Sequence, residues 1–375
     1  VTKHAANIAE LLRDEGYGTY CVGKWHLTPM EETSGAGPFD HWPTQSGFDR
    51  FYGFLQGETD QFHPELTLDN HHIERPGDKE DYHLSEDLVE NACKFINDSK
   101  SIYPEQPFFL YLSIYLPHLP WEAIPDEDRK HYEGKKLIVP NLSRHPEAAI
   151  SEDELRELMR SYYANISCAD RNIGRVLSTI DSLDLTKDTL VFFIGDNGFS
   201  VGQHGLLGKG NAVVLGTKDR KPNMFDDSVL VPFVARWPGV IEAGSISDVM
   251  VSTIDVLPTL IDITETETQL HLDGRSLLPI LKSQRGVKWR DEYCDTYDMT
   301  YLKEDHMRMI RTDEWKLVFH FDAAGKPFPY GRHELFNLSA DPGELRNLYD
   351  NDDFSLIRRS LEARLRKWIA EHDVR

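Results

Sequence analysis

The sequence contains few cysteines, fewer positive than negative charges, and no long apolar run. Four cysteines occur among 375 residues and no two of them form a CxxC pair, which excludes zinc-ribbon and disulfide-scaffold proteins. Lysine and arginine total 41 against 63 aspartates and glutamates, which gives a net charge of −22. Because this charge repels phosphate backbones, we expect no nucleic-acid partner. The longest apolar stretch, Phe108 to Leu116, is shorter than the roughly 20 residues of a membrane span, so we expect no transmembrane segment.

The sequence does contain enough apolar residues for a large core, because 40% of the chain is hydrophobic. Apolar, strand-like runs alternate with amphipathic, helix-like segments over most of its length. Strands are expected at residues 19–22, 108–115, 190–194 and 229–235, and helices at 2–15, 85–96, 151–180 and 254–261. This alternation predicts an α/β fold, in which a mostly parallel central sheet is flanked by helices. The polar stretch 28–81 has no clean period and is predicted to be loop-rich.

The pattern of expected elements changes near residue 291, from alternating strands and helices to paired strands, which indicates a second structural unit. Two paired strands are expected at 307–310 and 315–321, followed by a terminal helix at 354–372. We therefore predict a catalytic α/β domain over residues 1–290 and a small C-terminal α+β subdomain over 291–375. The chain opens at Val1 without an initiator methionine and is helix-like at once, so we expect the opening segment of the first domain to be missing.

Polar residues of catalytic type follow three of the expected strands. Lys24 and His26 follow the first, His118 follows the second, and Asp196 with Asn197 follows the third. The carboxyl ends of parallel strands meet at one edge of a sheet, which is where open α/β proteins bind ligands. These side chains are therefore expected to converge on one site.

Each of these groups has a functional and an ordinary interpretation. Asp196 and Asn197 offer a carboxylate and an amide oxygen, which Ca²⁺ and Mg²⁺ prefer, although an Asn-Gly turn after a strand needs no metal. Lys209 lies between two glycines and has room to approach an oxyanion, although it can equally be a solvated loop lysine. His118 alone is undecided between packing and catalysis.

Short motifs occur in one collinear order along the chain. The motifs are GKWHL at 23–27, GFDRFYGF at 47–54, LPHLP at 116–120, YYANIS at 162–167, GDNGF at 195–199, QHGLLGKGN at 203–211, VPFV at 231–234, IDVLPTL at 254–260, RTDEWKL at 311–317, ELFNL at 334–338 and DPGE at 341–344. Any single motif is weak, whereas the ordered set is specific and covers nearly the whole chain. The set resembles the sulfatase family, within the alkaline-phosphatase-like superfamily.

The resemblance implies a role for each candidate residue. Lys24 and Lys209 would bind the oxygens of a sulfate group, and His204 in the same loop as Lys209 would contact substrate. His26 would serve an aldehyde-hydrate nucleophile, and His118 would assist departure of the alcohol. The resemblance further implies that Asp196 and Asn197 ligate a divalent cation, usually Ca²⁺ and possibly replaced by Mg²⁺. The expected partner is a sulfated small molecule or glycan.

The sequence departs from the sulfatase pattern in its nucleophile. Sulfatases carry a C/S-x-P/A-x-R motif whose cysteine or serine becomes formylglycine, and two further aspartates bind the metal. The string Ser167 to Arg171 matches this motif but falls within the long helix expected at 151–180, so we reject it. We expect formylglycine upstream of Val1, made by a formylglycine-generating or sulfatase-maturing enzyme, and expect the 375-residue chain to be inactive alone. The resemblance is compatible with a periplasmic, extracellular or lysosomal-type location.

Hydrolysis of sulfate esters by an arylsulfatase-like enzyme is therefore the leading hypothesis. A phosphodiesterase or phosphonate-monoester hydrolase of the same superfamily is the first alternative, because it uses similar metal, lysine and histidine groups. A non-catalytic homologue that only binds anionic glycans is the second alternative. We expect specificity for the leaving group to lie in the segment 28–81, with Gln56, Glu58, Thr59, Asp60 and His63, but nothing in it names a sugar or an aryl group.

Overall fold

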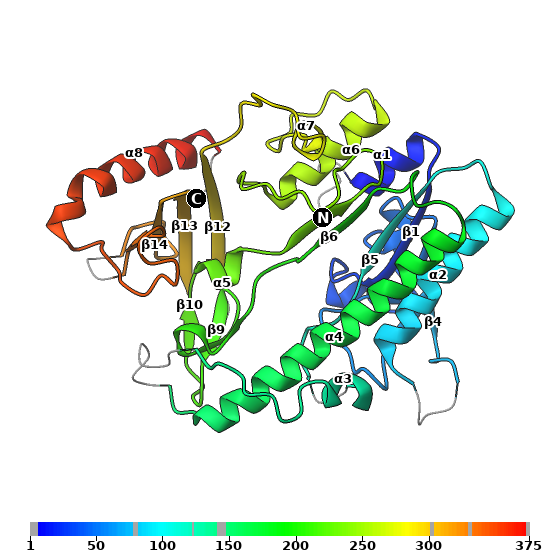
Figure 1. Ribbon diagram of the computed structural model, residues 1–375, viewed down its shortest axis with the longest axis horizontal. Coiled ribbons are helices and arrows are strands. Elements are labelled where there is room, and N and C mark those ends of the chain that lie inside the picture. The colour runs from blue at the N-terminus through cyan, green and yellow to red at the C-terminus, as the bar shows by residue number, and fades with distance from the viewer. Residues whose placement is uncertain are drawn as a thin grey trace.

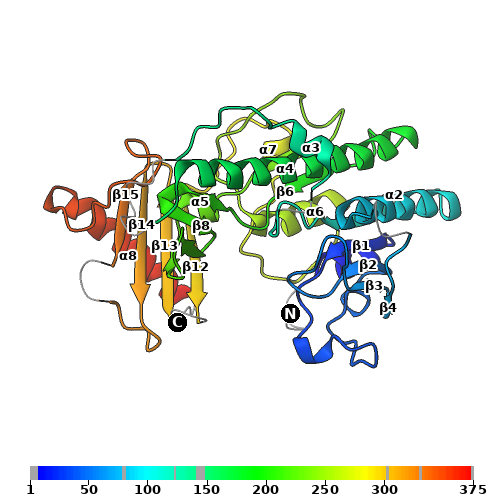
Figure 2. The ribbon, with the colours of Figure 1, turned by 90° about the horizontal axis from the view of Figure 1, so that it is seen from below.

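The computed structural model describes residues 7–77, 82–121, 124–140, 148–300, 304–328 and 332–372. The N-terminal α/β part and a second, C-terminal sheet lie toward opposite ends of the long axis, and the long helix α4 runs along one side (Figures 1 and 2). None of the helices in these described ranges has both the length and the apolar character that a membrane span requires.

The central sheet has five strands in the order β4-β3-β2-β1-β5. Strand β1 pairs in parallel with both β2 and β5, whereas β3 and β4 form an antiparallel edge. The predicted α/β fold with a mostly parallel central sheet is thus confirmed. The strand bounds are Gly18–Lys24 for β1, Arg50–Phe54 for β2, Leu66–Leu68 for β3, His71–Ile73 for β4 and Phe108–Ser113 for β5.

Helices cover both faces of this sheet. On one face, α2 (Leu84–Ile102) packs Leu88 and Phe95 against Val22 and Phe54. On the other face, α1 (Ile8–Asp14) contributes Ala9 to a cluster that includes Cys21, Trp42 and Phe51. Strand β1 is buried on both faces from Gly18 to Gly23, as expected for a central parallel strand.

Strand β2 lies within residues 28–81, whose described part is mostly loop, as predicted. It lies in the middle of the sheet, although its sequence, Arg50 to Phe54, has no polar-apolar alternation because both of its faces are buried. Two glycines allow it to approach β1 closely. A Cβ added at Gly53 would lie 2.0 Å from the carbonyl oxygen of Gly23, which itself has a φ of 109°.

The long helix α4 (Glu152–Ser182) begins at the predicted capping box, in which Ser151 and Glu154 bond reciprocally. It lies beside α2, and Arg171 of α4 reaches Glu86 of α2 at 2.8 Å. The string Ser167 to Arg171 lies inside this helix, as predicted.

Strand β6 (Val191–Ile194) forms a separate two-stranded sheet with β11 (Phe233–Arg236). The two strands are antiparallel. The strand predicted at 229–235 begins later than expected, because Asp226–Val229 forms the short helix α5.

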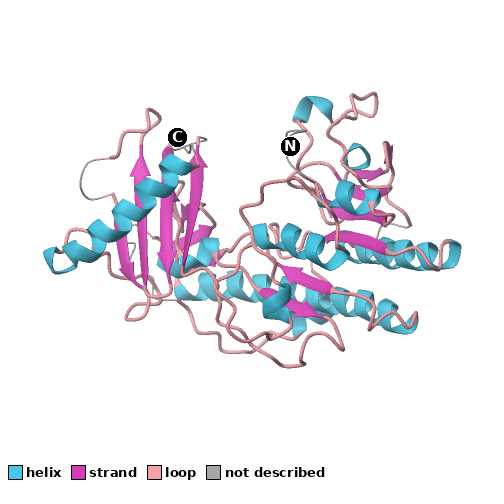
Figure 3. Ribbon diagram, turned by 90° about the horizontal axis from the view of Figure 1, so that it is seen from above, coloured by secondary structure: helices cyan, strands magenta, loops and turns pink. Residues whose placement is uncertain are grey.

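The C-terminal sheet has four antiparallel strands in the order β12-β13-β14-β15, and α8 (Ser355–Glu371) lies across one face (Figure 3). The paired strands predicted at 307–310 and 315–321 are confirmed as parts of β13 and β14. The other face packs against residues 206–225, where Met224 meets Met307 and Phe225 meets Phe336. The boundary at residue 291 stays a prediction.

The remaining elements are short or belong to this sheet. Strand bounds are Ser200–Val201 for β7, Leu206–Gly208 for β8, Asn211–Val214 for β9, Arg220–Pro222 for β10, Glu292–Met299 for β12, Asp305–Thr312 for β13, Trp315–Phe321 for β14 and Glu334–Asn337 for β15. Helix bounds are Asp126–Lys130 for α3, Val256–Thr264 for α6 and Leu278–Leu281 for α7. Strands β7 to β10 form an antiparallel sheet in the order β10-β9-β8-β7.

Candidate active site

The candidate site lies beyond the carboxyl ends of β1, β5 and β6. Lys24 is the last residue of β1, and Asp196 and Asn197 follow β6 directly. His118 lies in the loop after β5. His26, two residues beyond β1, adopts a φ of 59°, a left-handed conformation that is uncommon for a residue with a side chain. Lys24 acts electrostatically on both Asp196 and His118, so the three strand ends lie near one another. The third strand, β6, belongs to a separate antiparallel pair and not to the parallel sheet from which the convergence was predicted.

Lys24 interacts electrostatically with most of the other charged groups of the site. Partial burial and the positive charge of Lys209 lower the pKa of Lys24 below its usual value, while Asp196 and Glu58 oppose this change. The two ammonium groups of Lys24 and Lys209 repel each other. Binding of an anion between them would relieve this repulsion.

His26 is held under the chain segment that follows β2. A Cβ added at Gly57 would lie 2.6 Å from Nε2 of His26, so only glycine permits the chain to pass over this ring. Burial and the positive charges of Lys24 and Lys209 lower the pKa of His26, with a smaller effect from His118. The imidazole is therefore biased toward its neutral form, which can accept a proton.

His118 is oriented by Tyr115 and by the backbone of its own loop. Its Nδ1 lies 2.8 Å from the carbonyl oxygen of Leu119, which can only accept, so Nδ1 carries the proton and Nε2 faces away from this bond. Its ring stacks on Tyr115, at 5.0 Å between centroids. The Tyr115 hydroxyl donates to the same Leu119 oxygen at 2.7 Å and accepts a hydrogen bond from the backbone of Thr59. Burial is the main cause that lowers the pKa of His118, and Lys24 adds to it.

Lys209 reaches the site from the loop between β8 and β9. Its Nζ donates to Oδ1 of Asn197 at 2.7 Å, which joins this loop to the end of β6. The next residue, Gly210, lies against Tyr297 of the C-terminal sheet, because a Cβ there would lie 2.8 Å from the tyrosine ring. The C-terminal sheet thus supports the loop that carries Lys209.

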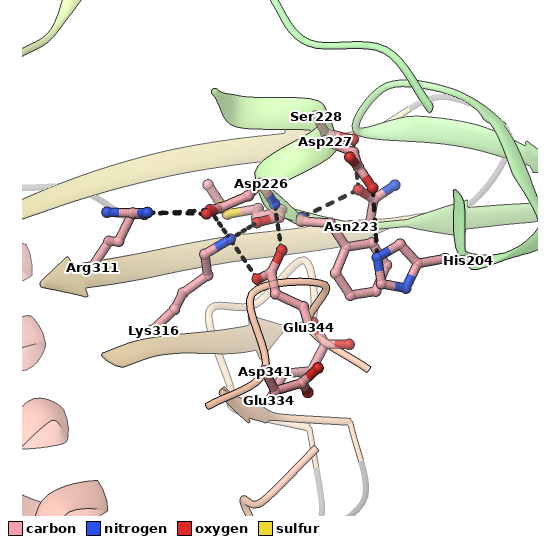
Figure 4. A network of polar contacts seen from close by, with 12 residues as sticks. His204, Asn223, Asp226, Asp227, Ser228, Arg311, Lys316, Glu334, Asp341 and Glu344 are labelled. Carbon is pink, nitrogen blue, oxygen red and sulfur yellow. Dashed lines mark hydrogen bonds and ion pairs between the residues drawn. The ribbon is translucent and has the colours of Figure 1, made fainter. Parts of the chain in front are cut away.

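His204 lies in the layer behind this loop. It is buried, stacks on Phe225 with 3.8 Å between ring centroids, and has its Nε2 3.7 Å from the carboxylate of Asp227. Figure 4 shows it beside a buried ionic network formed by Asp226, Lys316 and Glu344. Its predicted contact with substrate stays a prediction. Of the six other predicted residues, five lie at or after the ends of β1, β5 and β6, and Lys209 joins them from the loop between β8 and β9.

Two residues of the site escaped prediction from sequence: Tyr115 orients His118, and Gly57 makes room for the ring of His26. Glu58, which the sequence assigned to the segment of leaving-group specificity, also acts on the ionisation of Lys24 and both site histidines. The motif GFDRFYGF, which ends three residues before Gly57, was the nearest signal in the sequence.

The cysteines are not placed to act in this site. Cys21 and Cys168 are fully buried, in the central sheet and in α4. Burial raises the pKa of both thiols, that of Cys168 to about 12. Cys93 and Cys294 lie on α2 and β12, away from the strand ends that carry the site. The rejection of Ser167 to Arg171 as the nucleophile motif is consistent with this burial.

The chain has an alkaline-phosphatase-like fold. It belongs to the sulfatase family, because the family model described as sulfatase matches residues 1–266. A second family model, described as the C-terminal part of N-sulphoglucosamine sulphohydrolase, matches residues 217–371. The resemblance inferred from the ordered motifs is thereby confirmed.

Individual relatives agree with this assignment. An ulvan-active sulfatase from Formosa agariphila is 26% identical over 387 aligned residues, which cover 97% of this chain and 66% of that protein. This chain therefore spans about two thirds of the length of that relative.

Two solved structures share the fold. A protein solved in complex with its substrate D-glucosamine-2-N,6-O-disulfate aligns with a TM-score of 0.77 at 19% identity, over 98% of this chain and 82% of the other. The phosphonate monoester hydrolase of Agrobacterium radiobacter aligns with a TM-score of 0.74 at 23% identity, over 99% of this chain and 81% of the other.

Proposed function

We propose that the protein to which this chain belongs hydrolyses sulfate esters of small molecules or glycans. The observation that carries the proposal is the approach of Lys24 and Lys209 to His26 and His118 at one sheet edge, in a chain of the sulfatase family. Cleavage of a sulfate ester develops negative charge on the sulfuryl oxygens and on the departing alcohol oxygen. Two ammonium groups would stabilise the first charge, and a proton donor would stabilise the second.

Each side chain has a role that follows from its geometry. Lys24 and Lys209 would bind sulfuryl oxygens and hold the group in place. His118 keeps its Nδ1 proton on the Leu119 carbonyl, so its Nε2 would deliver a proton to the leaving oxygen. Binding of the sulfate between the two lysines would offset the positive charge that disfavours protonation of His118. His26, neutral in the free site, would accept a proton from the attacking group.

We further propose that Asp196 and Asn197 help to hold a divalent cation, Ca²⁺ in the first instance and Mg²⁺ as the alternative. A carboxylate and an amide oxygen next to each other are suitable hard ligands. Within the described ranges, no three His, Cys, Asp or Glu side chains form a further metal-ligating group. Asn197 already accepts the Lys209 ammonium, so the amide would orient the lysine and the cation toward the same anion. A bound cation would stabilise negative charge on the sulfuryl oxygens.

A formylglycine made by a maturing enzyme is the proposed source of the attacking oxygen. None of the four cysteines of this chain lies at the strand ends with the lysines and histidines. We therefore expect the 375-residue chain alone to lack turnover and to require the formylglycine-bearing segment for activity.

A phosphonate-monoester hydrolase is the second candidate, because such an enzyme shares this fold at a TM-score of 0.74. Assaying the natural protein on an aryl sulfate and on a matching aryl phosphonate distinguishes the two. We expect the sulfate to be hydrolysed with the higher kcat/KM. A preference for the phosphonate would favour the second candidate, and binding of both without turnover would favour a non-catalytic homologue.

The lysine assignment has its own test in the same assay. Lys209→Ala is expected to lower kcat/KM by more than tenfold, because interactions with a developing oxyanion contribute about 2–4 kcal/mol. Lys218→Ala is the matched control, since Lys218 is exposed at the turn between β9 and β10 of the same sheet. Equal activity of the two variants would remove Lys209 from the site.

A further inference from the structure

A small recess adjoins the candidate site on the side of β2, β3 and β4. Its cavity volume is about 80 Å³. Its polar lining includes Gln56, Glu58, Thr59, Glu65, Thr67 and His72. The recess is therefore able to take the hydroxyl or amino substituents along one edge of a sugar ring.

Glu58 belongs to both the recess and the lysine–histidine cluster. It lines the recess, and its negative charge raises the pKa of Lys24, His26 and His118 against the other effects that lower them. The preceding Gly57 lies against the ring of His26, and the backbone of Thr59 bonds to the Tyr115 hydroxyl. The segment 57–59 is therefore fixed between the cluster and the recess.

The far wall of the recess is already hydrogen-bonded. His72 has its Nε2 2.8 Å from the carbonyl oxygen of Thr33 and its Nδ1 3.2 Å from the hydroxyl of Thr67. Both ring nitrogens are therefore engaged within the protein. The carboxylate residues of the lining are Glu58 and Glu65.

Gln56 and Glu58 remain available to a ligand. Among the residues that the structure describes, no hydrogen bond engages either side chain. An amide and a carboxylate side by side can accept from hydroxyl and ammonium groups, and the amide can also donate.

We propose that Glu58 is a specificity-determining residue that selects a leaving group which is hydroxyl-rich and neutral or cationic, such as a monosulfated amino sugar. This inference rests on the proposed sulfate-ester hydrolysis and names the class of its substrate. The site is positive where Lys24 and Lys209 hold the sulfate, and negative where Glu58 and Glu65 face the rest of the molecule. A second anionic group placed in the recess would meet both carboxylates.

The charge of the whole chain points the same way. A net charge of −22 disfavours the approach of a densely sulfated polymer. It has little effect on a substrate with one negative and one positive charge. The selected substrate is therefore a sparsely sulfated sugar.

Three glucosamine 6-sulfates that differ at nitrogen test the proposal in the natural, active protein. The free amine carries a positive charge, the N-acetyl form is neutral, and the N-sulfo form is negative. We expect kcat/KM to fall in this order, with about tenfold between the first and the last. Glu58→Gln is expected to reduce that ratio to near one.

Glu105→Gln is the matched control, because Glu105 is exposed before the start of β5, at the opposite end of the sheet. It makes the same change of charge and should leave the ratio intact. Using a ratio removes any effect of Glu58→Gln that is common to all three substrates. An unchanged ratio in Glu58→Gln, or a preference of the unaltered protein for the N-sulfo form, would overturn the proposal.

A binding measurement separates this proposal from the sulfatase assignment. Glucosamine and N-sulfoglucosamine, which lack the 6-sulfate, can be titrated and followed by ligand-observed NMR. Preferential binding of glucosamine that is lost in Glu58→Gln would support the recess even if no ester were hydrolysed. Hydrolysis of all three esters without any dependence on Glu58 would retain the sulfatase function and reject the recess.

Discussion

At the scale of single residues, the site is governed by positive charges held close to two imidazoles. Lys24 acts on the ionisation of both His26 and His118, and burial acts in the same direction. Both rings therefore have a pKa below that of a free histidine, about 6.5. An anion between the lysines would reverse part of this effect, which couples substrate binding to proton transfer.

This coupling predicts the outcome of Lys24→Met. Removing the ammonium group removes a charge that opposes protonation, so the pKa of His26 and of His118 should both rise. Titration of the imidazole resonances by NMR measures the change, and added inorganic sulfate should raise the same two values in the unaltered protein. Lys187→Met is the control, because Lys187 is exposed before the start of β6, at the far end of the strand. If neither the pKa of His26 nor that of His118 changed by more than about 0.1 unit, the electrostatic effect of Lys24 on the two rings would be excluded.

The sequence could predict the charged residues of the site but not those that orient them. Lys24, His118 and Asp196 stand directly after apolar runs, and the carboxyl ends of strands are where such residues act. Tyr115 carries no such signal, and Glu58 was predicted only as a member of the specificity segment, not as a neighbour of Lys24. Their roles depend on the loop after β2 meeting the loop after β5, and this contact exists only in three dimensions.

At the scale of elements, strands with a distinctive apolar run were predictable and β2 was not. Strand β5 begins with Phe108-Phe109-Leu110 and was recognised, whereas β2 contains an arginine and a glycine within five residues. Its strand conformation depends on pairing with β1, where Gly53 and Gly23 lie opposite each other. Tertiary contact therefore decided the conformation of this segment, and local propensity did not.

The C-terminal sheet contains a buried ionic group whose stability effect depends on pH. His320 lies with its Nδ1 3.0 Å from Asp305 and its Nε2 3.5 Å from Glu334. Burial alone would lower its pKa, but the bonds to the two carboxylates outweigh burial and raise the pKa to about 9. The folded protein therefore holds this proton more tightly than the unfolded chain does.

The sign of the resulting pH dependence follows from linkage. The contribution of His320 to stability is complete below pH 6.5 and is lost as the pH rises through about 9. We expect the free energy of unfolding to fall by about 3 kcal/mol across this window. Asp305→Asn should reduce the fall, and Asp350→Asn, an exposed loop substitution, should not. Urea denaturation at a series of pH values measures it, and a full-sized fall in Asp305→Asn would contradict the assignment to His320.

At the scale of the whole molecule, the two parts of the chain are joined by a buried ionic network behind the loop of Lys209. Lys316 of β14 is fully buried and lies 2.6 Å from Asp226 of α5 and 2.6 Å from Glu344. Arg311 also reaches Asp226, at 3.0 Å (Figure 4). Burial raises the pKa of Glu344 to about 7, although Lys316 opposes the change. The C-terminal sheet is thus joined to the segment that follows the loop of Lys209.

Lys316→Met tests whether this ionic network contributes to the stability of the fold. Removing the ammonium leaves two buried carboxylates with fewer positive partners, and breaking a buried ion pair in this way costs about 3–5 kcal/mol. We therefore expect the free energy of unfolding, measured by urea denaturation, to fall by this amount. We also expect the affinity of the protein for sulfate to fall, because the loop of Lys209 loses its support. Lys326→Met, at an exposed turn of the same sheet, is the matched control and should change neither quantity.

The double variant Lys316→Met with Glu344→Gln separates unpaired charge from lost packing. Glu344→Gln removes one of the two carboxylates that Lys316 faces, so part of the stability lost in Lys316→Met should return. Affinity for sulfate should recover with it, because Asp226 keeps its pair with Arg311 and so holds α5 near the C-terminal sheet. If the loss of stability in the double variant equalled the sum of the losses in the two single variants, Lys316 and Glu344 would act independently. This ion pair would then not join the segment after the loop of Lys209 to the C-terminal sheet.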